Sequence, residues 1–219
     1  IDKAVAAKKP FLSVIWFHAP HLPCVAGPKH QDMYKKYPME TRNYAGCVTA
    51  LDEQIGRLRA HLKKIGADQN TMIWFCSDNG PESKANGKNG TAADFRGRKR
   101  DLYEGGIRVP GVMVWPAKIK AGRQTDMPCI TSDYVPTVLD ALGIDHPKSN
   151  YTLDGVSLLP LIEGKTEKRV NQIGHMFSGR LTFSNDKYKL VSYDKGQTYE
   201  LYDMANDKQE TKNIASQFP

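Results

Sequence analysis

A run of oxygen-bearing side chains directly follows an apolar stretch of strand length. Asp78-Asn79-Gly80 comes after residues 71–77, whose composition is that of a buried strand. Ligands of open α/β sheets gather at the carboxyl ends of strands. The Asp78 carboxylate and the Asn79 amide are hard oxygen ligands that suit Ca²⁺ or Mg²⁺. An ordinary Asx turn is the alternative, and it is favoured for this tripeptide taken alone.

Lys99 lies at the end of a polar loop, residues 81–97, and shortly before the adjacent glycines Gly105 and Gly106. Loops of this length in compact domains are usually functional or disordered. Paired glycines let the backbone turn sharply or approach a ligand closely, and a lysine ammonium can hold an anionic oxygen. A surface lysine beside a glycine turn is the alternative, and it is favoured for Lys99 considered alone.

Two histidines, His18 and His21, lie in a loop that prolines interrupt, after the apolar residues 10–17. An imidazole in such a loop could donate a proton to a leaving-group oxygen. A pair of ordinary loop histidines is an equally good interpretation of the same residues.

The three groups gain weight together because each follows or flanks a predicted strand, so all of them could converge on one edge of a sheet. They would supply oxygen ligands for a hard cation, an ammonium and an imidazole. That combination suits a tetrahedral anion, sulfate or phosphate, whose charge in the transition state must be neutralised.

Three strands and two helices would position these groups. Residues 10–17, 71–77 and 107–115 predict buried strands, although Pro110 weakens the third. Apolar residues recur at steps of three and four along residues 44–65, which predicts one long helix that Gly66 closes. A second helix is expected over residues 131–142. This order predicts an α/β fold with a mainly parallel sheet flanked by helices.

The C-terminal region has a different texture. After Pro147, short strand-like runs alternate with turn residues and predict a small antiparallel sheet. We therefore expect an α/β domain over residues 1–149 and a small α+β subdomain over residues 150–219, with the boundary near residues 147–154.

Composition excludes several classes of protein. The net charge is +7, but the basic residues are scattered, so a nucleic-acid partner is not expected. No apolar run reaches the length of a membrane span. The four cysteines form no CxxC pair, which argues against a zinc or redox motif. The chain begins at Ile1 without a signal peptide, so we expect a piece of a longer protein.

The motifs, in this order, resemble the formylglycine-dependent sulfatase family of the alkaline-phosphatase-like superfamily, in its C-terminal portion. The resemblance covers nearly the whole chain and is specific only as a combination. The matching segments are PHLP around His21, Asp78-Asn79-Gly80, KRDLYEGGIRVP (99–110), TSDYVPTVLDALG (131–143), DGVSLLPLIEG (154–164), KYKLV (187–191) and ELYDMANDKQETKNIA (200–215).

The resemblance implies roles for four residues. Asp78 and Asn79 would be two ligands of the active-site Ca²⁺, with Mg²⁺ as the alternative ion. Lys99 would bind the sulfate, and His21 would contact the sulfate and protonate the departing alcohol. Tyr103-Glu104-Gly105-Gly106 would shape the site without reacting.

One expected part of the family site is missing from this sequence. The family makes its formylglycine nucleophile from Cys or Ser in a C/S-x-P-x-R motif, and none of the four cysteines has that context. The paired N-terminal aspartates of the metal site are also missing. We expect both upstream of Ile1, in the N-terminal part of the same protein.

The resemblance implies a sulfuric ester hydrolase that acts on a carbohydrate or aryl sulfate in the periplasm or outside the cell, and it implies that this chain alone is inactive. Two alternatives stay open. One is a phosphodiesterase or phosphonate hydrolase of the same superfamily. The other is a non-catalytic module that binds anionic glycans through its positive charge.

Overall fold

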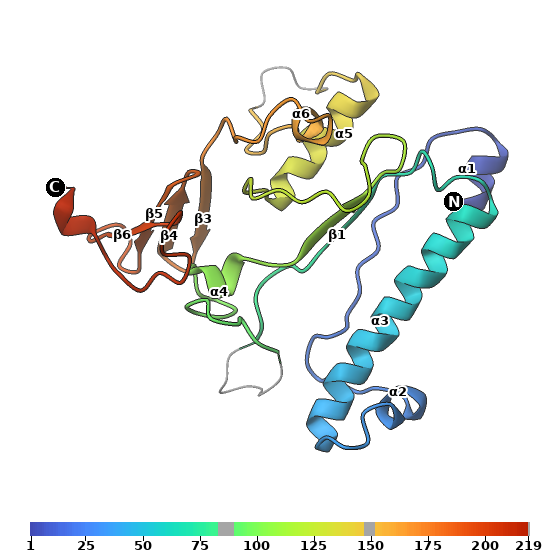
Figure 1. The fold of residues 1–219 in the computed structure, drawn as a ribbon, viewed down its shortest axis with the longest axis horizontal. Helices are drawn as coiled ribbons and strands as arrows, with labels where there is room; N and C mark the ends of the chain where they lie inside the picture. Colours follow the sequence, from blue (N-terminus) through green and yellow to red (C-terminus); the bar gives the residue numbers. More distant parts are fainter. Residues whose placement is uncertain (83–89, 147–151, 219) are drawn as a thin grey trace. The chain divides into compact units, whose positions relative to one another are not determined.

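The computed structural model describes residues 1–82, 90–146 and 152–218 (Figure 1). The chain forms two compact units. Of the described residues, the first unit contains 1–73 and 113–117, and the second contains 74–82, 90–112, 118–146 and 152–218. Within the described ranges, no helix combines the length and apolar character that a membrane span requires.

The first unit is built on one long helix. Helix α3 (Met39–Lys64) confirms the prediction from the apolar stripe, and Gly66 follows it with φ +70°, as a C-terminal glycine should. The short helices α1 (Asp2–Ala6) and α2 (Pro28–Asp32) precede it. Gly46 lets α2 and the residues before it approach α3 closely, because a Cβ there would lie 3.2 Å from His30 in α2 and 2.6 Å from the Ala26 Cβ. Asn43 fastens this contact by accepting the Ala26 N–H at 3.0 Å.

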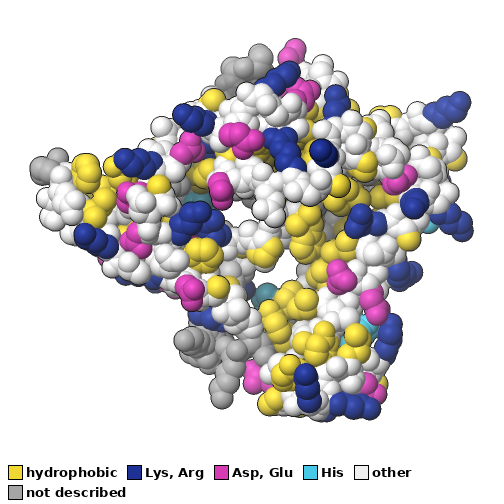
Figure 2. All heavy atoms as spheres, viewed as in Figure 1, with side chains coloured by type: hydrophobic (Ala, Val, Ile, Leu, Met, Phe, Trp, Pro, Cys, Tyr) yellow, Lys and Arg dark blue, Asp and Glu magenta, His cyan; other side chains and the backbone are white. Residues whose placement is uncertain are grey.

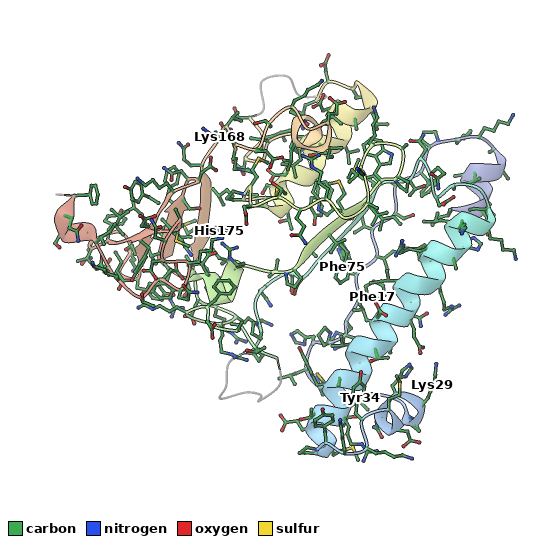
Figure 3. The ribbon with its side chains drawn as sticks, viewed as in Figure 1. Phe17, Lys29, Tyr34, Phe75, Lys168 and His175 are labelled. Carbon is green, nitrogen blue, oxygen red and sulfur yellow. The ribbon has the colours of Figure 1, made fainter. Side chains whose placement is uncertain are left out.

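The prediction of a buried strand at residues 10–17 is wrong for the described structure. This segment forms no strand, and its side chains are largely exposed: Leu12 is 80% exposed and Trp16 92%. Phe17, labelled in Figure 3, ends the segment and is also exposed. A strand needs a neighbour for its backbone groups, and the described residues provide no backbone hydrogen bonds to this segment.

The other two predicted strands are present but short. Strands β1 (Ile73–Cys76) and β2 (Gly111–Val114) form a two-stranded sheet. The β2 strand begins later than predicted because helix α4 (Glu104–Ile107) takes up the preceding residues and Pro110 has no N–H to donate.

The predicted second helix is confirmed as a 3₁₀ turn η1 (Thr131–Asp133) that continues into α5 (Tyr134–Leu142), with Gly143 at φ +63° after its end. Helix α6 (Leu159–Ile162) packs beside α5. Asp133 is fully buried and accepts two hydrogen bonds from Arg169, each 2.8 Å long. This bidentate pair ties the start of α5 to the segment that leads into the C-terminal sheet.

The C-terminal sheet is antiparallel, as predicted, with the strand order β3 (Ile173–Phe177), β4 (Arg180–Ser184), β5 (Tyr188–Ser192) and β6 (Glu200–Asp203). A 3₁₀ turn, η2 (Ala215–Gln217), follows it. One face of the sheet carries a buried cluster in which Val191 and Tyr202 pack against Tyr103. The predicted boundary near residues 147–154 falls largely outside the described residues and stays a prediction.

Candidate active site

The turn Asp78-Asn79-Gly80 follows β1 directly. The Ser77 hydroxyl donates to the Asn79 carbonyl oxygen at 3.0 Å, and the Asn79 side-chain nitrogen donates to the Gly80 carbonyl oxygen at 3.0 Å. The Asn79 amide oxygen is therefore left to accept a bond or to ligate a cation. The Asp78 side chain is exposed, and no hydrogen bond or ion pair to it is found among the described residues. The turn thus presents two hard oxygen donors.

Gly80 joins this turn to helix α4 through very close backbone packing. The Gly80 N–H donates to the Gly106 carbonyl oxygen at 2.8 Å, and a Cβ on Gly80 would lie 1.9 Å from the Gly105 carbonyl oxygen. A Cβ on Gly105 would in turn lie 2.2 Å from the Gly97 carbonyl oxygen. The paired glycines thus allow backbone to pack on backbone, and close approach of a ligand to them stays a prediction.

Lys99 lies on the neighbouring segment. Its N–H donates to the Pro81 carbonyl oxygen at 2.9 Å, just beyond the Asp78 turn. Its ammonium lies 3.7 Å from a carboxylate oxygen of Glu82, and both side chains are about four-fifths buried, with 20% exposure. Arg100 bonds the same carboxylate and holds φ +79°, an uncommon conformation for a residue other than glycine. The structure therefore brings the oxygen donors and the lysine onto adjoining backbone segments.

A buried ionic cluster holds α4 from the side of the C-terminal sheet. The Lys189 ammonium lies 2.9 Å from Glu104 and 2.8 Å from Glu210, and the three side chains are 1%, 10% and 0% exposed. Glu210 also accepts the Glu104 N–H at 2.6 Å, and Arg108 donates to Glu104 at 2.5 Å. Burial raises the pKa of Glu104, but the charges of Lys189 and Arg108 outweigh burial and hold that pKa below its usual value.

Burial determines the direction of the pKa shift for two other side chains, Glu210 in this cluster and His175 near it. It raises the pKa of Glu210 above its usual value in spite of Lys189, because one ammonium serves two carboxylates. His175 on β3 (Figure 3) lies near the same cluster, where burial and the Lys189 charge lower the pKa of its imidazole. The cluster is therefore dry enough for its charges to interact strongly.

A second polar cluster fixes the other side of the same segment. The Arg96 guanidinium stacks on the Tyr103 ring at 3.7 Å and donates to the Tyr202 hydroxyl at 2.7 Å. Both tyrosine hydroxyls donate to one oxygen of Glu200, at 2.5 and 2.7 Å. Burial, followed by this carboxylate, raises the pKa of Tyr202 to about 12. Residues 96–104 are thus anchored to the sheet through Arg96, Tyr103 and Glu104.

His21 belongs to the first unit, whereas Asp78, Asn79 and Lys99 belong to the second. The His21 Nδ1 donates to the Leu22 carbonyl oxygen at 2.7 Å. Because a carbonyl can only accept, this bond places a hydrogen on Nδ1. The His18 and His21 rings lie 5.3 Å apart, centroid to centroid. The shared site of His21 and Lys99 stays a prediction.

The donor set fits part of a metal site. Within the described ranges, no group of three or more His, Cys, Asp and Glu side chains is arranged to hold a metal ion. Asp78 and Asn79 supply two of the six to eight oxygens that Ca²⁺ takes. These two residues therefore fit the ion as a partial shell.

Basic side chains on the surface are mixed with acidic ones. On the face shown in Figure 2, Lys and Arg side chains of the described residues are interspersed with Asp and Glu and form no continuous basic stripe. This agrees with the scattered basic residues of the sequence.

Two family models match this chain. The model described as Sulfatase matches residues 1–144, and the model described as N-sulphoglucosamine sulphohydrolase, C-terminal, matches residues 97–218. The chain belongs to the sulfatase family. It is a C-terminal portion of a family member, with the alkaline-phosphatase-like α/β fold that was predicted.

Curated relatives agree with this assignment. The uncharacterized sulfatase YdeN of Escherichia coli is 34% identical over 76% of this chain and 30% of its own length. The N-acetylglucosamine-6-O-sulfatase of Bacteroides thetaiotaomicron is 32% identical over 82% of this chain and 32% of its own length. The chain therefore spans about a third of the length of these two curated relatives.

Solved structures match over more of their length. The crystal structure of Ps i-CgsB in complex with k-i-k-neocarrahexaose has a TM-score of 0.87 and 29% identity, over 99% of this chain and 48% of that chain. A phosphonate monoester hydrolase of Agrobacterium radiobacter is more distant, with a TM-score of 0.58 and 25% identity over 81% of this chain and 37% of that chain.

Lys189 and Glu210, which hold the site segment, were not predicted as functional residues, although both lie in segments that resemble the family. One signal was available. Alternation along β5 places Lys189 on the same face as the buried Val191, and a lysine on a buried face needs a carboxylate partner. The identity of that partner was not readable from the pattern.

Proposed function

We propose that the protein to which this chain belongs hydrolyses sulfate esters. The observation that carries the proposal is the junction of the Asp78-Asn79 turn with the Lys99 segment, through hydrogen bonds of 2.8–2.9 Å and glycine backbones without room for a Cβ. Membership of the sulfatase family supports sulfate as the anion.

The residues of this chain would divide the work. The Lys99 ammonium would hold a non-bridging oxygen of the sulfate and neutralise charge that develops there. Asp78 and Asn79 would offer their side-chain oxygens to a cation. His21, with its Nδ1 hydrogen committed to a carbonyl, would use Nε2 to protonate the departing alcohol.

Two groups of the proposed reaction are not side chains of this sequence. A Ca²⁺ ion, with Mg²⁺ as the alternative, would supply positive charge beside the sulfate, and a formylglycine from another segment of the protein would supply the nucleophile. Asp78 and Asn79 fit the first group as two of its ligands. No C/S-x-P-x-R motif for the second occurs in the 219 residues.

A sulfated carbohydrate is the proposed natural substrate. The proposal is supported by the relative named as an N-acetylglucosamine-6-O-sulfatase and by the similar structure in complex with a neocarrahexaose. The net charge of +7 would attract an anionic glycan. We propose a periplasmic or extracellular location, where such glycans are met.

The test uses the full-length protein that contains this chain, with an aryl sulfate as substrate. Lys99→Ala should lower kcat/KM by about 100-fold or more, the usual effect of removing one donor to a developing anion. Lys118→Ala is the control. The Lys118 side chain is 48% exposed and its ammonium lies as far as 4.0 Å from a carboxylate oxygen of Glu163, so its loss should leave activity within twofold. Wild-type activity that Lys99→Ala leaves intact would refute the assignment.

A phosphonate or phosphate diester hydrolase is the second candidate, favoured by the similarity to the phosphonate monoester hydrolase. The same enzyme preparation should be offered a phosphonate monoester and a phosphate diester. The sulfatase proposal expects the aryl sulfate to have the highest kcat/KM. A preference of tenfold or more for a phosphorus ester, which corresponds to about 1.4 kcal/mol in the transition state, would favour the second candidate.

A further inference from the structure

The buried cluster of Lys189, Glu104 and Glu210 joins segments far apart in the chain. Glu104 is separated from Lys189 by 85 residues and from Glu210 by 106. Lys189 comes from the middle of β5, and Glu210 comes from the segment after β6 and has φ +57°. Of the four carboxylate oxygens, one on Glu104 accepts from the partly exposed Arg108 and one on Glu210 accepts the Glu104 N–H. The other two, one on each glutamate, contact the single buried ammonium of Lys189.

Helix α4 connects the buried cluster to the Asp78 turn. Glu104 is its first residue, and Glu210 holds the Glu104 N–H at 2.6 Å. The next two residues are the glycines whose backbones touch Gly80 and the Lys99 segment, and Gly105 N–H donates to the Arg96 carbonyl oxygen at 2.7 Å. Backbones packed this closely cannot slide past one another, so a displaced α4 must displace its neighbours.

We propose that Lys189 is a positioning residue for the sulfatase reaction: it holds α4 so that the Asp78-Asn79 turn and Lys99 keep their mutual placement. This inference rests on the proposed function, which supplies the reaction. Lys189 itself would touch neither the sulfate nor the cation, because its side chain is 1% exposed and its ammonium is occupied by two carboxylates.

The chain offers a matched control for the loss of a buried cation. Arg169 is 2% exposed and bonds the fully buried Asp133 in the same unit, but it holds the start of α5 and not α4. Lys189→Met and Arg169→Met each remove one buried positive charge. Both should destabilise the protein, and only Lys189→Met should disturb the site segments.

The first measurement is amide hydrogen exchange of the full-length protein, followed by mass spectrometry. Lys189→Met should speed exchange in peptides that cover residues 78–82 and 96–106 by about tenfold relative to Arg169→Met, and Lys189→Arg should restore most of the protection. If Lys189→Met does not fold, Glu210→Gln replaces it in this experiment. This variant removes one carboxylate partner of Lys189 but keeps an acceptor for the Glu104 N–H. Equal exchange of these peptides in the Lys189 and Arg169 variants would overturn the proposal.

The second measurement is aryl sulfate hydrolysis over a series of Ca²⁺ concentrations. Lys189→Met should lower kcat by about 10- to 100-fold, as misplaced catalytic groups do, and should raise the Ca²⁺ concentration for half-maximal activity. Arg169→Met should change neither value by more than twofold at a temperature where it is folded. If wild type hydrolyses no sulfate ester, the proposed function fails, while the exchange experiment still decides whether Lys189 controls the Asp78 turn.

Discussion

Replacing Gly80 by alanine should force apart the Asp78 turn and helix α4. The new Cβ would lie 1.9 Å from the Gly105 carbonyl oxygen, 2.9 Å from its carbon and 3.1 Å from the Gly106 Cα, whereas ordinary contact begins at 3.4 Å. All three atoms belong to backbone and cannot rotate away. The two segments must therefore separate, and the hydrogen bond from Gly80 N–H to Gly106, 2.8 Å long, is lost with them.

The cost follows from two effects. Overpacking of a buried site costs about 1–3 kcal/mol, and the lost hydrogen bond adds about 1 kcal/mol. A total of about 2–4 kcal/mol would lower the melting temperature of a chain of this size by about 4–16 °C. Thermal unfolding should be followed in the near-ultraviolet circular dichroism, because the Trp74 and Tyr134 rings are in contact within the same unit, with centroids 3.9 Å apart.

Gly56→Ala is the matched control. Gly56 lies inside α3, and no atom lies within 4 Å of its would-be Cβ. Alanine there should stabilise the chain by about 0.5–1 kcal/mol, since glycine is a poor helix former. If Gly80→Ala melted within 1 °C of wild type, taken as roughly 0.3–0.5 kcal/mol, the close backbone packing would be refuted.

Three further predictions concern the rest of the chain. Arg169→Met should lower the free energy of unfolding by about 3–5 kcal/mol in urea denaturation, because it leaves the Asp133 carboxylate buried without its partner; a loss under about 1 kcal/mol would contradict the buried pair. Hydrogen bonds from the Thr198 side chain and backbone and from Ser192 lower the pKa of Asp194 from 3.8 to about 2, so its contribution to stability should be complete above pH 4 and disappear as the pH falls toward 2. An NMR titration midpoint at or above 3.8 for Asp194 would contradict this. The purified 219-residue chain should not hydrolyse aryl sulfates; hydrolysis that Lys99→Ala abolishes would overturn that expectation.

Local sequence patterns predicted two helices and the C-terminal sheet. The periodic apolar stripe gave α3 and its terminal Gly66, and the capping residues before α5 gave that helix. Short strand-like runs separated by turn residues predicted the antiparallel C-terminal sheet. The same kind of reasoning gave a wrong prediction for residues 10–17, because an apolar run becomes a strand only where another backbone completes its hydrogen bonds.

The residues proposed for the site could be selected from the sequence, whereas the contacts that hold their segments in place could not. Hard oxygen donors after β1, a lysine and paired glycines could be found one segment at a time. The attachment of Glu104 to Lys189 and Glu210 joins residues more than 80 positions apart, and no local pattern specifies which buried carboxylate meets which ammonium.

The central claim is that Asp78, Asn79, Lys99 and His21 serve one sulfate-and-cation site. The most direct measurement is a crystal structure of the full-length protein grown with Ca²⁺ and an unreactive sulfated sugar. We expect side-chain oxygens of Asp78 and Asn79 to bind the ion, and the Lys99 ammonium and a His21 ring nitrogen to lie within hydrogen-bonding distance of the sulfate group. A sulfate group bound elsewhere, with Lys99 and His21 directed away from it, would contradict the account.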